Sequence, residues 1–90
     1  MTDKQNPEDL LEYPCQYQFK AVGAAGESFK NAIVHAIGQH AAIAKDAVKS
    51  RLSGKGTYQS VSVLVTLHSY PQLTKIYAEI RQAPGLKMLI

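Results

Sequence analysis

Disulfide pairs, membrane-spanning segments and secretion signals are all missing from this sequence of 90 residues. The single Cys15 cannot form an internal disulfide, and no apolar run approaches the roughly 18 residues that span a bilayer. No charged-then-apolar segment opens the chain. These absences predict a cytoplasmic protein with no membrane partner. Cys15 itself is expected to be a small buried hydrophobic residue, because no histidine or aspartate pattern marks it as a nucleophile.

Catalytic and metal-binding patterns are missing as well. The acidic residues after position 15 are isolated from one another, and no serine, histidine and aspartate set has a supporting strand-turn-helix context. His35 and His40 are five residues apart, so a helix turns them away from each other, whereas paired metal ligands are three or four residues apart. We therefore expect no enzyme activity, no catalytic residue, no metal site and no cofactor.

What the sequence does contain is a charge distribution that divides it into two parts. Residues 1–14 hold four acidic residues against one lysine, while residues 15–90 hold nine basic residues against three acidic ones. Residues 1–12 have too few apolar anchors to offset the entropy of ordering, which predicts a flexible acidic leader. Residues 13–90 are then a single basic domain, and a basic domain favours acidic partners.

Hydrophobic periodicity predicts six elements of secondary structure, because alternation indicates strands and apolar residues three or four positions apart indicate helices. The first helix starts near Glu27, with Ala41 still at helical spacing, and the second is capped by Ser69 with Gln72 three residues later. The predicted strands cover residues 15–22, 48–52, 58–68 and 86–90.

The passage 41–48 fits both the end of the first helix and the start of the second strand. A strand is favoured, because the strand that begins at Tyr58 needs an antiparallel partner across the turn containing Gly54 and Gly56. The order strand, helix, strand, strand, helix, strand predicts an α+β fold, a ferredoxin-like sandwich of a four-stranded antiparallel sheet with two helices on one face. The uncovered face is then polar, with Gln16, Gln18, Lys20, Ser60, Ser62 and Thr66.

The glycine-rich basic turn at residues 53–57 is a candidate anion-binding site, because backbone amides around glycines can form an anion nest. A strand follows it instead of a helix, which excludes a P-loop. Base stacking of the RNA-recognition type is disfavoured, because serine and glutamine on the uncovered face offer no stacking platform. The remaining mode is salt-sensitive contact with phosphates or an acidic partner through Lys49, Arg51, Lys55 and Tyr58.

Several segments together resemble the YbeD-like family, small cytoplasmic bacterial proteins of unknown function. The lysine-glycine turn followed by a serine-valine strand is the most specific of them. In residues 40–46 the chain departs from the family, since it is richer in alanine and lacks the usual Pro-Gly break. The segments that carry the resemblance are LLEYP at 10–14, FKAVG at 19–23, SGKGTYQSVSV at 53–63, IY at 76–77 and KMLI at 87–90.

The resemblance implies a fold similar to ACT regulatory domains and a strand before the glycine turn. ACT domains typically pair with one another and bind small effectors near the loop after the first strand, which implies a homodimer and a ligand site at Gly23 and Gly26. The same glycines could equally serve only the tight turn. Family members are often encoded near lipoyl-transfer enzymes, which implies an accessory role in lipoate or cofactor metabolism as a weaker alternative.

The function predicted from the sequence is that of a small non-catalytic binding or regulatory module. It would act through a protein partner, self-association as a homodimer or a small-molecule effector. The alternative is a nucleic-acid-associated protein that binds phosphates through the basic hairpin.

Overall fold

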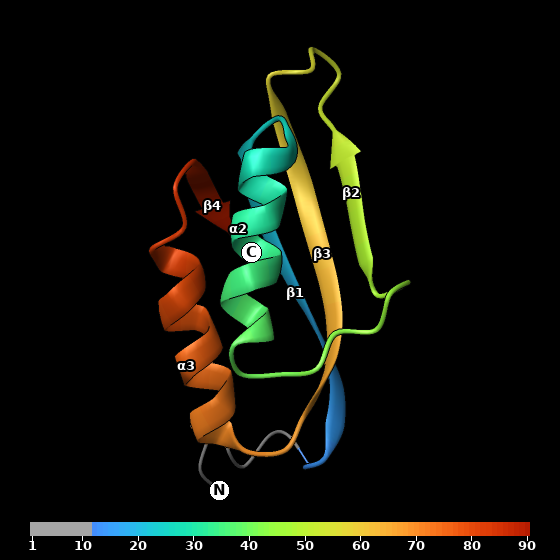
Figure 1. Cartoon of the computed structure of the whole chain (residues 1–90), viewed down its shortest axis with the longest axis vertical. Coiled ribbons are helices and arrows are strands. Elements are labelled where there is room, and N and C mark those ends of the chain that lie inside the picture. Colours follow the sequence, from blue (N-terminus) through green and yellow to red (C-terminus); the bar gives the residue numbers. More distant parts are fainter. Residues whose placement is uncertain (1–11) are drawn as a thin grey trace, which may run out of the picture.

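The computed structural model describes residues 12–90, and its architecture confirms the predicted ferredoxin-like α+β fold (Figure 1). The predicted flexible leader, residues 1–12, lies outside the described residues except for Glu12. The elements in chain order are β1 (Cys15–Ala24), α2 (Glu27–Gly38), β2 (Val48–Leu52), β3 (Tyr58–Leu67), α3 (Tyr70–Arg81) and β4 (Leu86–Leu89).

The four strands form one antiparallel sheet in the order β2, β3, β1, β4. Its centre is the long ladder between β1 and β3, which runs from Cys15 opposite Leu67 to Ala24 opposite Tyr58. Both helices lie on the same side of the sheet, so one face is covered and the other is open (Figure 1). Since side chains alternate between the two faces, this register decides which residues are exposed together.

The core lies between the covered sheet face and the two helices. The valines of β3, the aromatic residues of β1 and the apolar stripes of both helices meet there, as their spacing predicts. Fully burying a side chain of this size stabilises the fold by about 1.5 to 3 kcal/mol. The buried apolar residues are Phe19, Ala21, Phe29, Ile33, Ala36, Ile37, Val61, Val63, Val65, Leu67, Leu73, Ile76 and Ile80.

The first helix ends at Gly38, so Ala41 does not continue it, and the strand favoured for residues 41–48 begins only at Val48. After Gln39 the chain runs without helix or strand until β2 begins at Val48. The chain has to cross here from the helix layer to the outer edge of the sheet, which a continued helix would prevent. Ile43 anchors the crossing, because it packs against the core and its Cδ1 lies beside Gly38.

The second helix begins as predicted, with Ser69 as its N-cap. The backbone N–H of Gln72 donates to Ser69 Oγ at 3.3 Å. The Gln72 side chain accepts from the backbone N–H of His68 at 2.6 Å, one residue before the cap, and donates to the carbonyl of His40 at 2.8 Å. The side chain of Gln72 thus helps to cap the N-terminus of α3 and hydrogen-bonds it to the segment that follows α2.

An aromatic cluster fills the end of the core beside the start of β1. The rings of Tyr17, Phe19 and Tyr77 meet edge to face, with centroids 4.9 to 6.4 Å apart. The hydroxyls of Tyr17 and Tyr77 are 2.7 Å apart and form a hydrogen bond. Burial, and then the bond with Tyr17, hold the pKa of Tyr77 well above its usual range. Cys15, predicted to be buried, is half-buried and packs against the core at this end.

Candidate anion-binding site

The open face is the side of the sheet that the helices do not cover. Its residues alternate with the buried ones along β1 and β3, and the six polar residues predicted for this face all lie on it. Gln16 also donates from Nε2 to Thr66 Oγ1 across the two strands at 3.3 Å. The face is polar in its centre, as the alternation of serine and valine in β3 predicts.

Three cations meet in the centre of the open face. Lys20 in β1 and Lys49 in β2 are both opposite Ser62 in the strand between them. Arg51 lies two residues further along β2, opposite Ser60. Neighbouring strands are about 4.8 Å apart, so the backbones of Lys20 and Lys49 are about 10 Å apart, and their long side chains can reach the same space above Ser62. We call this group of three cations and two serines the basic cluster; its members are Lys20, Lys49, Arg51, Ser60 and Ser62.

No acidic side chain among the described residues forms an ion pair with the basic cluster. Glu27 lies in the first turn of α2, Glu79 on α3, Asp46 in the connection before β2 and Glu12 before β1. Within residues 12–90, no carboxylate comes within ion-pair distance of any of its cations. Like charges gathered on one face repel one another at low salt, so this arrangement stabilises nothing by itself. An anion above the face would remove the repulsion.

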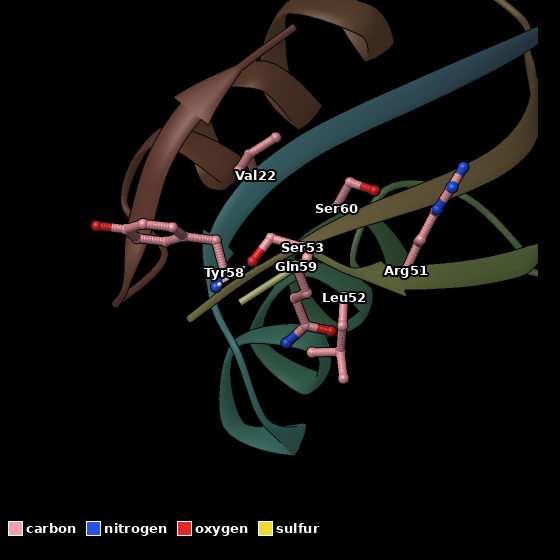
Figure 2. A pocket seen from close by; sticks show the side chains of 8 residues that line it. Val22, Arg51, Leu52, Ser53, Tyr58, Gln59 and Ser60 are labelled. Atoms are coloured by element: carbon pink, nitrogen blue, oxygen red, sulfur yellow. Dashed lines mark hydrogen bonds between the residues drawn. The ribbon is translucent and has the colours of Figure 1, made fainter. Parts of the chain in front are cut away.

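Two shallow hollows lie side by side over the basic cluster. One, of about 360 Å³, is lined by all five members of the cluster together with Ser50. The other, of about 330 Å³, shares Arg51 and Ser60 with it and continues over Val22 to Tyr58 and the glycine turn. Figure 2 shows Val22, Ser60 and Arg51 on one side of the sheet, while Leu52 and Gln59 point to the other. Both hollows have volumes at the lower end of those typical of small-ligand sites.

The residues predicted for anion binding divide into two groups. Lys49 and Arg51 belong to the basic cluster, and Tyr58 lines the second hollow. The ammonium group of Lys87 lies 5.1 Å from the centroid of the Tyr58 ring, which is a cation–π contact. Lys55 lies at the exposed tip of the hairpin and lines neither hollow. The hairpin itself closes as a five-residue turn, in which the N–H of Ser53 donates to the carbonyl of Tyr58 at 2.8 Å.

Gly23 and Gly26, predicted to admit a ligand, lie in different surroundings: Gly23 is within the end of β1 and tightly packed, and Gly26 follows β1. A Cβ on Gly23 would collide with the Phe29 ring and lie 2.6 Å from the carbonyl oxygen of Gly85. Gly26 has φ of 114°, a conformation that favours glycine, and has open space where a side chain would start. The buried Gln59 donates from Nε2 to the carbonyls of Ala24 at 2.9 Å and Gly26 at 2.6 Å. The role of these glycines in ligand binding stays a prediction.

The helix face brings no metal-ligand cluster together among residues 12–90. His35 bonds through Nε2 to the side chain of Gln39 at 2.9 Å, whereas His40 Nε2 lies 3.6 Å from a carboxylate oxygen of Glu79 on the neighbouring helix. The two histidines thus have separate partners. No helix within residues 12–90 is long and apolar enough to cross a membrane.

Two important side chains were not singled out from the sequence. Lys20 was placed on the open face but not among the anion-binding residues, since only the register between β1 and β3 shows that it is beside Lys49. Gln59 is buried but is not among the residues predicted to be so. Its signal was available, because alternation puts it on the same face as the valines of β3.

These features define a ferredoxin-like sandwich of the ACT type, with a basic open sheet face. The chain belongs to the DUF493 family, described as a protein family of unknown function, whose match covers residues 8–90. The YbeD-like resemblance is thereby confirmed. A UPF0250 protein of Shewanella woodyi is 32% identical over 84 residues, covering 92% of this chain and 93% of its own length. Another, of Ectopseudomonas mendocina, is 33% identical over 92 residues and covers all of both chains.

Two solved structures share the fold. A solution structure of a protein from H. pylori matches with a TM-score of 0.67 at 14% identity, over 98% of this chain and 91% of that one. The ACT domain of the GTP pyrophosphokinase of Chlorobium tepidum matches with a TM-score of 0.60 at 16% identity, over 86% of this chain and 96% of that one. At such identities the likeness shows the fold, and the ACT-like topology implied by the sequence is confirmed.

Proposed function

We propose that this protein is a non-catalytic binding module with a regulatory role, which binds a small anionic effector on its open face. The observation that carries this proposal is the basic cluster, where Lys20, Lys49 and Arg51 gather over Ser60 and Ser62 and have no ion-pair partner in residues 12–90. The three cations repel one another at low salt, and an anionic ligand bound above them would remove that repulsion.

A regulatory role fits the other features of the molecule. The hollows over the cluster are shallow and open to solvent, and neither is lined by a histidine or by an acidic side chain. The same fold forms the ACT domain of the GTP pyrophosphokinase of Chlorobium tepidum, where it is one domain of an enzyme. A cytoplasmic location, expected from the sequence, is part of the same proposal.

Thermal-shift screening with metabolites sorted by charge tests this function. The wild type is compared with an open-face variant, Lys20→Gln, Lys49→Gln and Arg51→Gln. A helix-and-turn control, Lys30→Gln, Lys45→Gln and Lys75→Gln, removes the same number of charges outside both hollows. We expect at least one anionic metabolite to raise the melting temperature of wild type and control but not of the open-face variant. Ligands that stabilise all three proteins equally, or no anionic ligand at all, would contradict the proposal.

Nucleic-acid binding is a second candidate, supported by the same cations. Lys20, Lys49 and Arg51 are spread over two strands and could contact successive phosphates. Tyr58 is the one aromatic side chain on this face within residues 12–90, which gives little surface for base stacking. Filter binding of a single-stranded oligonucleotide across a salt series tests it: retention at low salt that the open-face variant loses supports this candidate, and no retention removes it.

The predicted homodimer would have to avoid the free edge of β2. Suppose two copies paired antiparallel along this strand, with their helices on the same side of a continuous sheet. Lys49 or Arg51 of one copy would then lie directly opposite Lys49 or Arg51 of the other, and opposed like charges destabilise a strand pair. Sedimentation in low and high salt checks this: a dimer held through β2 should form only when salt screens the charges.

A further inference from the structure

The two hollows over the open face differ in chemistry, and this difference specifies a ligand. The first is lined by cations and hydroxyls, while the second lacks the two lysines and is lined by Val22 and the ring of Tyr58. They share Arg51 and Ser60, so a single small molecule can occupy both. Such a ligand would have a strongly anionic end and a flatter, less polar body.

The anionic end is best matched by a phosphate group. A phosphate monoester carries close to two negative charges and three acceptor oxygens, whereas a carboxylate carries one charge and two oxygens. The guanidinium of Arg51 suits two of these oxygens at once, and the ammonium groups of Lys20 and Lys49 supply mobile point charges on either side. Ser62, directly between the two lysines in the register, presents a hydroxyl to the same space.

The body of the ligand has a partly apolar floor. Val22 is opposite Ser60 on the open face and is half-buried, so a ring could lie flat on its methyl groups. The ring of Tyr58 is 38% exposed and forms the far wall, where Lys87 holds a cation 5.1 Å from its centroid. A planar ring fits this position, because aromatic and cationic groups both favour contact with a flat π system.

We propose that the open face binds a phosphorylated small molecule, with its phosphate between Lys20, Lys49 and Arg51 and its ring over Val22 beside Tyr58. This inference rests on the proposed function, and it narrows the anionic effector to a phosphate monoester that carries a planar ring. Neither hollow is enclosed, so binding is expected to be weak, with a Kd on the order of 100 μM.

NMR titration of the 15N-labelled full chain tests the proposal, with AMP, inorganic phosphate and adenosine as probes. Phosphate should shift the amide signals around Ser62 only, whereas AMP should also shift those of Val22 and Tyr58 and bind at least about threefold tighter. Adenosine, which lacks the phosphate, should bind at least about tenfold more weakly than AMP. The open-face variant should weaken AMP at least about tenfold, and the helix-and-turn control should leave its Kd unchanged.

A second variant separates the two ends of the ligand. Tyr58→Ala should weaken AMP about threefold while the Kd of inorganic phosphate stays the same, because only the ring loses a contact. Three results would overturn the inference: no shifts with either probe at about 10 mM, AMP no tighter than phosphate, or binding that the open-face variant retains.

Two further probes tell apart the ways in which the inference can fail. Citrate that binds as tightly as AMP and is lost in the open-face variant would remove the phosphate proposal but keep the anionic-effector function. A ten-nucleotide single strand that binds more than about a hundredfold tighter than AMP would overturn both in favour of nucleic acid. The proposal is supported if AMP binds more tightly than both citrate and the oligonucleotide and if the open-face variant loses this binding.

Discussion

Replacing Gly23 with alanine is the change whose cost follows most directly from the structure. Gly23 lies near the end of β1, where the chain passes between the Phe29 ring and the backbone of Gly85. The added methyl group would collide with two atoms of that ring and lie 2.6 Å from the Gly85 carbonyl oxygen. Neither neighbour can move easily: Phe29 is 2% exposed within the core, and the Gly85 carbonyl accepts a hydrogen bond from the N–H of Ala24 at 3.0 Å.

The expected cost is about 2 to 3 kcal/mol. Overpacking a tight core costs about 1 to 3 kcal/mol, and two clashes against fixed groups put this site at the upper end. The usual gain from replacing glycine, about 0.4 to 1 kcal/mol through the unfolded chain, reduces the net loss slightly. For a domain of this size the melting temperature should fall by roughly 8 to 24 °C.

Urea and thermal unfolding followed by circular dichroism measure this effect, with Gly54→Ala as the control. Gly54 has no atom within 4 Å of the position of an added Cβ and no positive φ, so its substitution should change the free energy of unfolding by less than about 0.5 kcal/mol. The double variant Gly23→Ala with Phe29→Leu should lose less stability than the two single variants together, since the smaller side chain relieves one clash. Equal stability of Gly23→Ala and wild type would refute the packing argument.

Four further predictions follow from other contacts. Gln59→Leu should lower the free energy of unfolding by about 1 to 3 kcal/mol in urea, because two loop carbonyls lose their donor; a loss below about 0.5 kcal/mol would contradict it. Ser69→Ala should cost about 1 kcal/mol in the same assay, and an unchanged midpoint would show that the cap contributes nothing. The pKa of Tyr77 is raised in the folded protein, so the hydroxyl of Tyr77 loses its proton at a lower pH in the unfolded chain, and the free energy of unfolding falls as the pH rises above about 10. Tyr77→Phe should therefore lose less stability between pH 10 and higher pH than wild type does. An equal loss in both proteins would contradict the raised pKa. Lys20→Gln should raise the melting temperature at low salt and not in 1 M NaCl, where repulsion within the basic cluster is screened; a gain that persists in high salt would contradict that cause.

The sequence predicted the fold well because its patterns are local and repeated. β3 alternates serine with valine over its whole length, and α3 combines a cap, a proline in its first turn and an apolar stripe. Such signals need no knowledge of distant residues. The end of α2 could not be found in the same way. Ala41 has good helix propensity, and what stops the helix before it is the path of the chain to the sheet edge, a tertiary requirement.

Only some residues of the candidate site could be predicted from the sequence, for a related reason. Lys49 and Arg51 belong to a hairpin whose short turn fixes the register with β3, so their common face could be predicted. Lys20 is 29 positions before Lys49 and joins it only through the non-local ladder between β1 and β3. Lys55 drew attention because it is next to the glycines in sequence, although its position at the hairpin tip takes it away from both hollows.

Residues on the covered face of the sheet stabilise the fold, whereas the cations on the open face are proposed to bind a ligand. This difference makes the proposed function testable. Residues such as Gly23 and Gln59 serve the covered side, where a substitution changes packing or leaves a buried polar group without a partner. The cations of the basic cluster contribute no ion pair within residues 12–90, so replacing them with glutamine should not lower the stability of the fold. A loss of binding in the open-face variant, at unchanged or higher stability, therefore reports on the ligand contact itself. If that variant instead unfolded, the cations would have a structural role, and the argument that they are kept for a ligand would fail.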